Sequence, residues 1–403
     1  MNNINIINLL QFLFLIYMGF SAIYLLVFAI SSFFYKSSEL TEDTVLRKFV
    51  ILIPAYKEDT VILNTASEAL NQNYPSNLYD VYVIADSFEP ATIELLQKEK
   101  DIKCIEVSFE QSTKARSINK ALVSINNDYD GVIILDADNI MEVDFIRKVN
   151  SAMSNGDTAI QCHRVAKNLD TSFAILDAIS EEINNTIFRK GHVPLGISSA
   201  LIGSGMAFDF NLYKSIMLGI DTYADEDKEL EIKLSLNRSK VNYLNNTYVY
   251  DEKVSNSKVF VNQRSRWISS QIFFARTFLF KSIYELFAHS NFDFFNKILQ
   301  FLLVPRILLL GLSFLITIFS IFFNTEFFFY SWLSIFVVCV VSIGLSVPKR
   351  FYNRQTYIAI LSLPYGFLMM ALAVLRIKTG RKRLSPTPHN SSTNVPIHKK
   401  NSK

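Results

Sequence analysis

Residues 130–146, DGVIILDADNIMEVDFI, combine a short apolar run with two closely spaced aspartates. The apolar run, residues 132–135, is short and rich in β-branched side chains, as expected for a strand buried on both faces of a sheet. Asp136 and Asp138 follow this run with one residue between them. Two carboxylates at a strand end can coordinate a divalent cation that bridges phosphate oxygens. Alone, such a D-x-D pair is more often a simple strand end, so its interpretation depends on the rest of the chain.

Short apolar runs on both sides of this stretch predict alternating strands and helices. Strands are expected at residues 48–54, 79–85, 102–107, 131–136 and 157–162. Residues 58–72 and 113–126 lie between strands and repeat apolar side chains every three or four positions, which is a helical period. The alternation predicts an α/β domain with a mostly parallel central sheet covered on both faces. Ligands of such sheets bind at the carboxyl ends of the strands, where Asp86 and Asp136 fall.

The composition predicts a membrane protein that carries a globular domain. Half of the 403 residues are hydrophobic, with 34 Phe and 18 Tyr. The 40 basic residues nearly balance the 37 acidic ones, so no nucleic-acid partner is expected. Cys104, Cys162 and Cys339 share no C-x-x-C spacing, which argues against a disulfide framework and a structural zinc site. The globular domain is expected over residues 47–291.

An uncharged segment at the start of the chain predicts a membrane anchor, assigned to residues 1–35. Residues 8–34 exceed the roughly 20 residues that a helix needs to cross the hydrocarbon core. The segment lacks the basic start and the small-residue cleavage site of a secretory signal, so we expect it to be retained. Basic residues follow it at Lys36, Arg47 and Lys48, which places the next domain in the cytoplasm by the positive-inside rule.

Three apolar blocks predict further membrane helices within residues 298–376. The first two, residues 298–323 and 327–347, are expected to form a hairpin across the bilayer. The third, residues 357–375, has Pro364 and Gly366 at its centre, and its sequence leaves open whether it crosses the membrane or re-enters. The polar tail, residues 384–403, is expected to be disordered. We therefore expect a multi-pass protein of the cell (inner) membrane whose globular domain faces the cytoplasm.

Three motifs near the expected strand ends predict a pocket for a charged nucleotide. The first is ILIPAYKED, residues 51–59, a strand followed by a polar turn, and the second is VYVIADSFEP, residues 81–90, which ends on Asp86. The third, TKARSINKAL, residues 113–122, places Lys114 at a helix start, where backbone amides favour an anion. Each motif is weak alone, and an isolated lysine is most often a solvated surface residue.

Three later motifs add glycines, acids and a basic aromatic cluster. LIGSGMAFDFNLY, residues 201–213, contains glycines that permit a close approach of the backbone to a ligand. YADEDKELEIKL, residues 223–234, is typical of a solvated helix N-terminus, because its acids complement the helix dipole. VNQRSRWISSQ, residues 261–271, places Gln263, Arg266 and Trp267 on one helical face. An amphipathic interfacial segment is expected at about residues 268–291.

Taken in order, these motifs resemble the membrane-bound family 2 glycosyltransferases, the group that includes cellulose, chitin, hyaluronan and poly-N-acetylglucosamine synthases. IPAYKED resembles the first nucleotide-binding strand, and KARSIN resembles a basic segment near the diphosphate. The chain also carries the D-x-D motif, DEDKEL in place of T-E-D-x-x-L, and QRSRW as Q-x-x-R-W. The sequence departs from the family pattern at Asp225, which replaces a threonine, and after Asp86, where a second aspartate is absent.

The resemblance implies a GT-A-type nucleotide-sugar-binding domain flanked by transmembrane helices, and it implies a role for each matching residue. Asp227 would be the catalytic base. The residues that would bind the donor nucleotide are Pro54, Ala55, Glu58, Asp86, Lys114, Asp136 and Arg266. The residues that would bind the acceptor are Gly203, Ser204, Gly205, Glu226, Gln263 and Trp267. A cofactor, Mg²⁺ or Mn²⁺, would bind Asp138 with help from Asp136.

The expected function is that of a metal-dependent inverting glycosyltransferase at the membrane. It would move a hexosyl or N-acetylhexosaminyl group from a nucleotide-sugar donor, expected to be a UDP-sugar, to a growing polysaccharide or glycan acceptor. One alternative is a single addition to a lipid acceptor, such as ceramide or polyprenyl phosphate. A second is a non-catalytic nucleotide-binding membrane partner, and a third is a transporter, which the small number of helices disfavours. The motif residues do not specify the donor sugar, the acceptor or the linkage.

Overall fold

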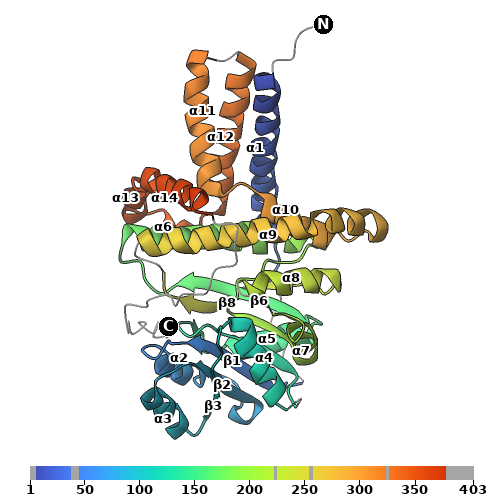
Figure 1. Ribbon diagram of the computed structural model, residues 1–403, viewed down its shortest axis with the longest axis vertical. Helices are drawn as coiled ribbons and strands as arrows, with labels where there is room; N and C mark the ends of the chain where they lie inside the picture. The colour runs from blue at the N-terminus through green and yellow to red at the C-terminus, as the bar shows by residue number, and fades with distance from the viewer. Residues whose placement is uncertain are drawn as a thin grey trace, which may run out of the picture.

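The computed structural model describes residues 6–37, 45–126, 128–221, 225–253, 257–323 and 326–377. Figure 1 shows a long molecule with a helical bundle at one end and a sheet domain at the other. The bundle consists of α1 (Ile6–Ser31), α11 (Arg306–Phe323) and α12 (Glu326–Ser346). Helices that lie crosswise separate the two ends: α6 (Ser172–Asn184), α9 (Ser257–His289), α10 (Phe292–Leu302), α13 (Arg354–Ile360) and α14 (Leu363–Leu375).

The sheet domain contains one mixed sheet with the strand order β3-β2-β1-β4-β7-β6-β8-β5. The five predicted strands are confirmed as β1 (Phe49–Tyr56), β2 (Tyr79–Asp86), β3 (Ile102–Val107), β4 (Gly131–Ile134) and β6 (Ala159–Ala166). Three strands were not predicted: β5 (Ile140–Met141), β7 (Met206–Asp209) and β8 (Asn242–Asp251). The first four strands in this order are parallel, whereas β7 runs antiparallel to both β4 and β6. The mostly parallel α/β sheet is therefore confirmed, with antiparallel additions.

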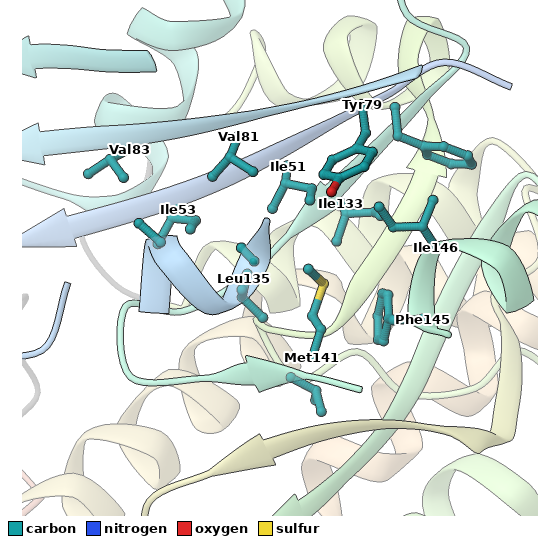
Figure 2. Packing of buried hydrophobic residues seen from close by; sticks show 14 of the residues in the cluster. Ile51, Ile53, Tyr79, Val81, Val83, Ile133, Leu135, Met141, Phe145 and Ile146 are labelled. Carbon is teal, nitrogen blue, oxygen red and sulfur yellow. The ribbon is translucent and has the colours of Figure 1, made fainter. Parts of the chain in front are cut away.

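Alternate side chains of the central strands fill two separate cores, one on each face of the sheet. Ile51, Ile53, Ile133 and Leu135 point to one face, where Figure 2 shows them packed with Val81, Val83 and Phe145. The helices on this face are α2 (Ile62–Ala69), α3 (Pro90–Lys98) and α5 (Phe145–Ser154). The intervening side chains reach the other face, which is covered by α4 (Lys114–Ser124), α7 (Phe210–Met217) and α8 (Glu226–Leu236). Burial on both faces explains why residues 132–135 form a continuous apolar run.

In the part of the chain that the structure describes, two segments are long and apolar enough to cross a membrane, Leu9–Phe34 and Glu326–Ser346. Among the described residues, α10 and α11 form a pair bent by 56°, and α13 and α14 form a pair bent by 49°. The predicted first block, residues 298–323, is thus broken before Arg306. The third predicted block is also broken, and Pro364 lies in the first turn of α14. Figure 1 shows α13 and α14 across the base of the bundle rather than alongside it.

The predicted interfacial segment, residues 268–291, lies in the crosswise helix α9 and the two residues that follow it, up to Asn291, the N-cap of α10. One face of α9 is buried through Phe274 and packs with α10, whereas Phe280 and Phe287 are each 82% exposed. Apolar side chains therefore lie on both faces of this helix, and its interfacial, amphipathic character stays a prediction. The predicted disordered tail, residues 384–403, lies outside the described residues.

We expect Ile133→Ala to destabilise the domain, because Ile133 is fully buried in the first core. Truncation of a buried isoleucine costs about 2–4 kcal/mol, which should lower the melting temperature by about 5–10 °C. Thermal unfolding of the full chain in detergent measures this shift. Val123→Ala provides the control, because Val123 is 68% exposed. Equal melting temperatures for the two variants would contradict the assignment of Ile133 to the core.

Candidate active site

A cavity of about 510 Å³ lies at the carboxyl ends of β1 and β4. It brings together predicted site residues from separate parts of the chain: Pro54, Ala55, Glu58, Lys114, Asp136, Asp138, Gly203, Glu226, Asp227, Gln263, Arg266 and Trp267. The other three predicted residues, Asp86, Ser204 and Gly205, are not among those that line the cavity. We refer to the part lined by Pro54, Lys114, Asp136 and Asp138 as the nucleotide side.

Lys114 connects three walls of the cavity. It begins α4, whose N-cap Thr113 accepts a hydrogen bond from the Arg116 amide. Its ammonium lies 2.5 Å from an Asp136 carboxylate oxygen, 2.7 Å from the Gly203 carbonyl oxygen and 3.4 Å from a Glu226 carboxylate oxygen. Burial alone would lower the pKa of this ammonium, yet the surrounding acids raise it above its usual value, so Lys114 is charged at neutral pH.

The D-x-D loop is held from behind by the residues that follow Gly203. The Asp136 amide donates to the Ser204 hydroxyl at 2.9 Å, and that hydroxyl donates to the Asn139 side-chain oxygen at 2.6 Å. The amide nitrogen of Asn139 donates in turn to Asp138 at 2.8 Å and to Asp251 at 3.1 Å. Ser204 is fully buried in this chain of hydrogen bonds. The structure therefore places it behind the cavity wall, where it fixes the loop that carries both aspartates.

Asp86 is also fully buried, behind the nucleotide side of the cavity. Its carboxylate accepts hydrogen bonds from the hydroxyls of Ser87, Ser112 and Ser117 at 2.9, 2.9 and 3.1 Å. Ser112 and Ser117 line the cavity themselves. The structure thus puts serine hydroxyls between the Asp86 carboxylate and the space that a nucleotide would occupy.

Asp227 lies in the first turn of α8 and has an unusual acidity. The pKa of its carboxyl is raised to about 7, chiefly by burial; Lys228 lowers this pKa, whereas Glu226 and Asp225 raise it. Gly203 faces this carboxyl with a φ of +87°, and a Cβ at Gly203 would lie 3.8 Å from an Asp227 oxygen and 3.6 Å from the Lys114 nitrogen. A carboxylate that titrates near neutrality can accept a proton from a hydroxyl group at physiological pH.

The Q-x-x-R-W residues of α9 form the wall of the cavity opposite the sheet. Between them, Arg264 stacks on the Trp267 ring at 4.5 Å and forms an ion pair with Asp177 of α6 at 2.8 Å. The Nε atom of Arg266 is buried and has no hydrogen-bond partner among the described residues. An uncompensated guanidinium N–H in a cavity is a suitable donor for an anionic ligand.

A network of buried charges lines the cavity away from the nucleotide side, and none of its residues was predicted from the sequence. Glu181 of α6 accepts from Arg164 at 3.0 Å and from Arg189 at 2.9 Å, and Lys253 pairs with Asp251 at 2.7 Å. Arg189 lies in a π-helix, Asn185–Lys190, a conformation often found at functional sites. These residues match no motif, and the only signal in the sequence was the occurrence of charges within apolar stretches.

The acidic residues fit a divalent cation that takes most of its ligands from a substrate. Among the described residues, no group of three or more His, Cys, Asp or Glu side chains is arranged to hold a metal ion. Asp136 and Asp138 both line the cavity, and Lys114 pairs with Asp136. Mg²⁺ and similar ions commonly bind one or two carboxylates and complete their coordination with phosphate oxygens and water. These two carboxylates are therefore the candidate ligands.

The family model described as "Glycosyltransferase like family 2" matches residues 47–270, more than half of the chain. The chain belongs to this family. The match includes the sheet, the D-x-D loop and the Q-x-x-R-W segment, and it ends before α10. The narrower resemblance to cellulose, chitin and hyaluronan synthases remains a prediction.

Several known proteins are similar to this family 2 glycosyltransferase at low sequence identity. A beta-monoglucosyldiacylglycerol synthase from Synechocystis sp. (strain ATCC 27184 / PCC 6803 / Kazusa) is 23% identical over 54% of the chain. The matched stretch spans only 46% of that synthase. The probable glycosyltransferase YdaM from Bacillus subtilis is 22% identical over 82% of the chain and 71% of its own length. A probable glucomannan 4-beta-mannosyltransferase 1 from Arabidopsis thaliana is 26% identical over 75% of the chain and 58% of its own length.

A solved structure shares the fold of most of this chain. The mannosyltransferase PcManGT from Pyrobaculum calidifontis, solved in complex with GDP-Man and Mn²⁺, superposes with a TM-score of 0.54 at 15% identity. The match covers 90% of this chain and 99% of that one. It confirms the predicted GT-A-type fold, including a sheet domain attached to candidate membrane helices.

We expect Glu181→Gln to destabilise the protein strongly. Burial alone would raise the pKa of the Glu181 carboxyl, yet Arg164 and Arg189 hold it well below its usual value, so the carboxylate is charged. Its neutralisation removes the carboxylate that pairs with Arg189 and leaves Arg164 with Asp251 alone, at 3.6 Å. The cost is about 3 kcal/mol, or about 6–12 °C in melting temperature. Glu94→Gln is the matched control, because Glu94 pairs with Lys98 on an exposed helix face. Equal melting temperatures for Glu181→Gln and Glu94→Gln would contradict the assignment of Glu181 to this network of ion pairs.

Proposed function

We propose that this protein is a membrane-bound inverting glycosyltransferase. It transfers a sugar from a nucleotide-diphosphate donor to a saccharide or lipid-linked acceptor at the cytoplasmic surface of the cell (inner) membrane. The observation that carries the proposal is the cavity, which gathers the D-x-D loop, Asp227 and the Q-x-x-R-W residues from distant parts of the chain. Membership in the glycosyltransferase family supports the reaction type. The cytoplasmic orientation rests on the basic residues Lys349, Arg350 and Arg354, which follow α12.

In the proposed reaction, the acceptor hydroxyl attacks the anomeric carbon of the donor sugar. The new carbon–oxygen bond forms as the bond from that carbon to the diphosphate breaks, and the nucleoside diphosphate leaves. Asp227 takes the hydroxyl proton, which suits a carboxylate whose pKa is near 7. Arg266 and Lys114 line the cavity and stabilise the negative charge of the leaving diphosphate. Gln263 and Trp267 orient the acceptor sugar, since aromatic rings stack on sugar faces.

A divalent cation, Mg²⁺ or Mn²⁺, would be held by Asp138 with Asp136 beside it. When bound, it would neutralise the diphosphate and act as a Lewis acid on the leaving group. Lys114 keeps the Asp136 carboxylate in position through the 2.5 Å contact. The Mn²⁺ in the PcManGT complex supports the use of a divalent ion here. GDP-Man in that complex makes a GDP-sugar an alternative to the UDP-sugar expected from the sequence.

Polymer synthesis and single addition to a lipid are the two candidate outcomes of this chemistry. The Arabidopsis relative is named as a glucomannan mannosyltransferase, which supports a polysaccharide product. The Synechocystis relative is named as a glucosyldiacylglycerol synthase, which supports a lipid acceptor. Among the described residues only two helices could cross a membrane singly, or up to four if each bent pair forms one span. This small membrane region favours a single addition or a short glycan over a secreted polymer.

Incubation of the purified full chain with a panel of nucleotide sugars tests the proposed function. We expect release of nucleoside diphosphate with one of the donors. Mass analysis of the product should then show either a single added sugar or a series of products that differ by one sugar unit. Asp227→Asn, which removes the base, should lower the rate by about 100-fold or more. Undiminished turnover in Asp227→Asn would exclude it as the base. Absence of turnover with all UDP-, GDP-, TDP- and CDP-sugars would contradict the transferase assignment.

The rate should depend on pH through the ionisation of Asp227. Because the base must be deprotonated, kcat/KM should fall about tenfold per pH unit below about 7 and level off above it. Lys228→Met removes the cation that lowers this pKa, so the profile should move to higher pH. Lys233→Met, one turn and a half further along α8, is the control and should leave the midpoint unchanged. A midpoint that does not move in Lys228→Met would contradict the assignment.

Asp138→Asn should weaken Mn²⁺ binding in the presence of nucleoside diphosphate by about tenfold or more, because it removes a charged ligand. Calorimetric or spin-resonance titration of Mn²⁺ measures the affinity without turnover. Asp170→Asn is a control on a carboxylate that is not among the cavity-lining residues. Equal Mn²⁺ affinities for the two variants would exclude Asp138 as a ligand.

A further inference from the structure

The part of the cavity nearest the membrane helices is rich in arginines, which we call the membrane-side arginine cluster: Arg164, Arg189, Arg264 and Arg306. They come from β6, the π-helix, α9 and the first residue of α11. The first three line the cavity, and Arg306 adjoins it, donating to the Ser180 carbonyl at 3.0 Å and to the Ser180 hydroxyl at 3.1 Å. Arg306 is close enough to Arg189 and Arg264 to be repelled by both.

Acidic side chains pair with three of the four arginines in this cluster. Asp177 pairs with Arg264, and Glu181 pairs with both Arg164 and Arg189. Among the described residues, Arg306 forms no ion pair, and Arg264 and Arg189 repel it. A buried cation without a counter-charge favours binding of an anion over binding of a neutral sugar.

Two arginines of the cluster also have buried donors without partners. Among the described residues, Nε of Arg164 and Nη1 of Arg306 are buried and make no hydrogen bond. Nε of Arg164 lies 3.6 Å from an Asp251 oxygen, too far for a hydrogen bond. An unsatisfied buried donor on a charged group is costly. Phosphate oxygens can satisfy several guanidinium groups at once.

The position of the cluster indicates where such an anion comes from. Arg306 starts the apolar helix α11, so the cluster lies at the base of the bundle of α1, α11 and α12 (Figure 1). Phe188 and Phe301 line the same part of the cavity and pack with apolar side chains of the membrane-side helices. The donor diphosphate has its own partners on the nucleotide side, near Lys114 and Asp138. A second anion that binds at the base of the bundle, next to apolar side chains, fits the phosphate headgroup of a lipid.

We propose that the membrane-side arginine cluster binds the phosphate of a lipid-linked acceptor. The inference rests on the proposed transferase function and narrows its acceptor from any saccharide or lipid to one that carries a phosphate group at the membrane surface. The phosphate binds Arg164, Arg264 and Arg306, and the acceptor hydroxyl lies further into the cavity, toward Asp227. A neutral glycan or a neutral diacylglycerol would leave the buried guanidinium donors unsatisfied.

Equilibrium binding to the full chain in detergent tests this proposal without requiring turnover, with farnesyl phosphate, farnesol and inorganic phosphate as probes. Farnesyl phosphate should bind at least about tenfold more tightly than either of the others, because it offers both the anion and the apolar chain. Arg264→Gln and Arg306→Gln should each weaken its binding by about tenfold. Arg306→Lys keeps the charge and should retain most of the affinity. Arg354→Gln, an exposed basic residue at the start of α13, is the matched control and should bind as the wild type does.

Equal affinity for farnesol and farnesyl phosphate would overturn the proposal, as would glutamine variants that bind like Arg354→Gln. Inorganic phosphate bound as tightly as farnesyl phosphate would overturn the assignment to a lipid. Equal losses in Arg306→Gln and Arg306→Lys would show that the side chain acts through the fold and not through its charge. Nucleotide-sugar turnover by the same preparations is scored separately. Turnover without a preference for the phosphate rejects only this inference, whereas phosphate binding without turnover of any donor rejects the transferase function.

Discussion

The architecture of the site depends on one partly buried lysine, Lys114. The Lys114 ammonium contacts Asp136 at the end of the central strand, the carbonyl of Gly203 and Glu226 at the start of α8. These groups come from three segments that would otherwise repel one another or leave polar atoms unpaired. A charge-assisted contact of this kind is short and directional, so it fixes the separation between the strand ends and the helix that carries Asp227. The acids beside Lys114 keep it charged, and it in turn balances part of their charge.

The ion pairs formed by the acids around Lys114 also bear on the pKa of Asp227. Asp136 has its cation in Lys114, and Asp225 has Lys228 at 3.2 Å. Burial beside Asp225 and Glu226 raises the pKa of the Asp227 carboxyl to about 7, although Lys228 lowers it. The acids of DEDKEL therefore have different partners, and Asp227 is left with a carboxyl that titrates near neutral pH. General acid–base catalysis is most effective with such a group.

The predictable part of the structure was the part that depends on local pattern. The apolar run before Asp136 and the similar runs at residues 48–54, 79–85 and 102–107 predicted the parallel strands. Burial on both faces of a sheet requires apolar side chains at consecutive positions. The short strand Met206–Asp209 was missed, since four residues within a glycine-containing loop give little periodicity and its place between β4 and β6 is set by tertiary pairing. Arg164, Glu181, Arg189 and Lys253 were missed for a similar reason: their pairing joins segments far apart in the chain. The roles of Ser204 and Asp86 became visible only through hydrogen bonds that the sequence does not encode locally.

In the proposed reaction, the cavity holds the diphosphate of a nucleotide sugar between the D-x-D loop and α9. An experimental structure of the full chain with a nucleoside diphosphate and Mn²⁺ tests this placement. We expect the ion on Asp138, the diphosphate within hydrogen-bond distance of Arg266, and the base on the nucleotide side near Ser112 and Ser117. A nucleotide bound elsewhere, or bound in the cavity without contact to Asp138 or Arg266, would contradict it.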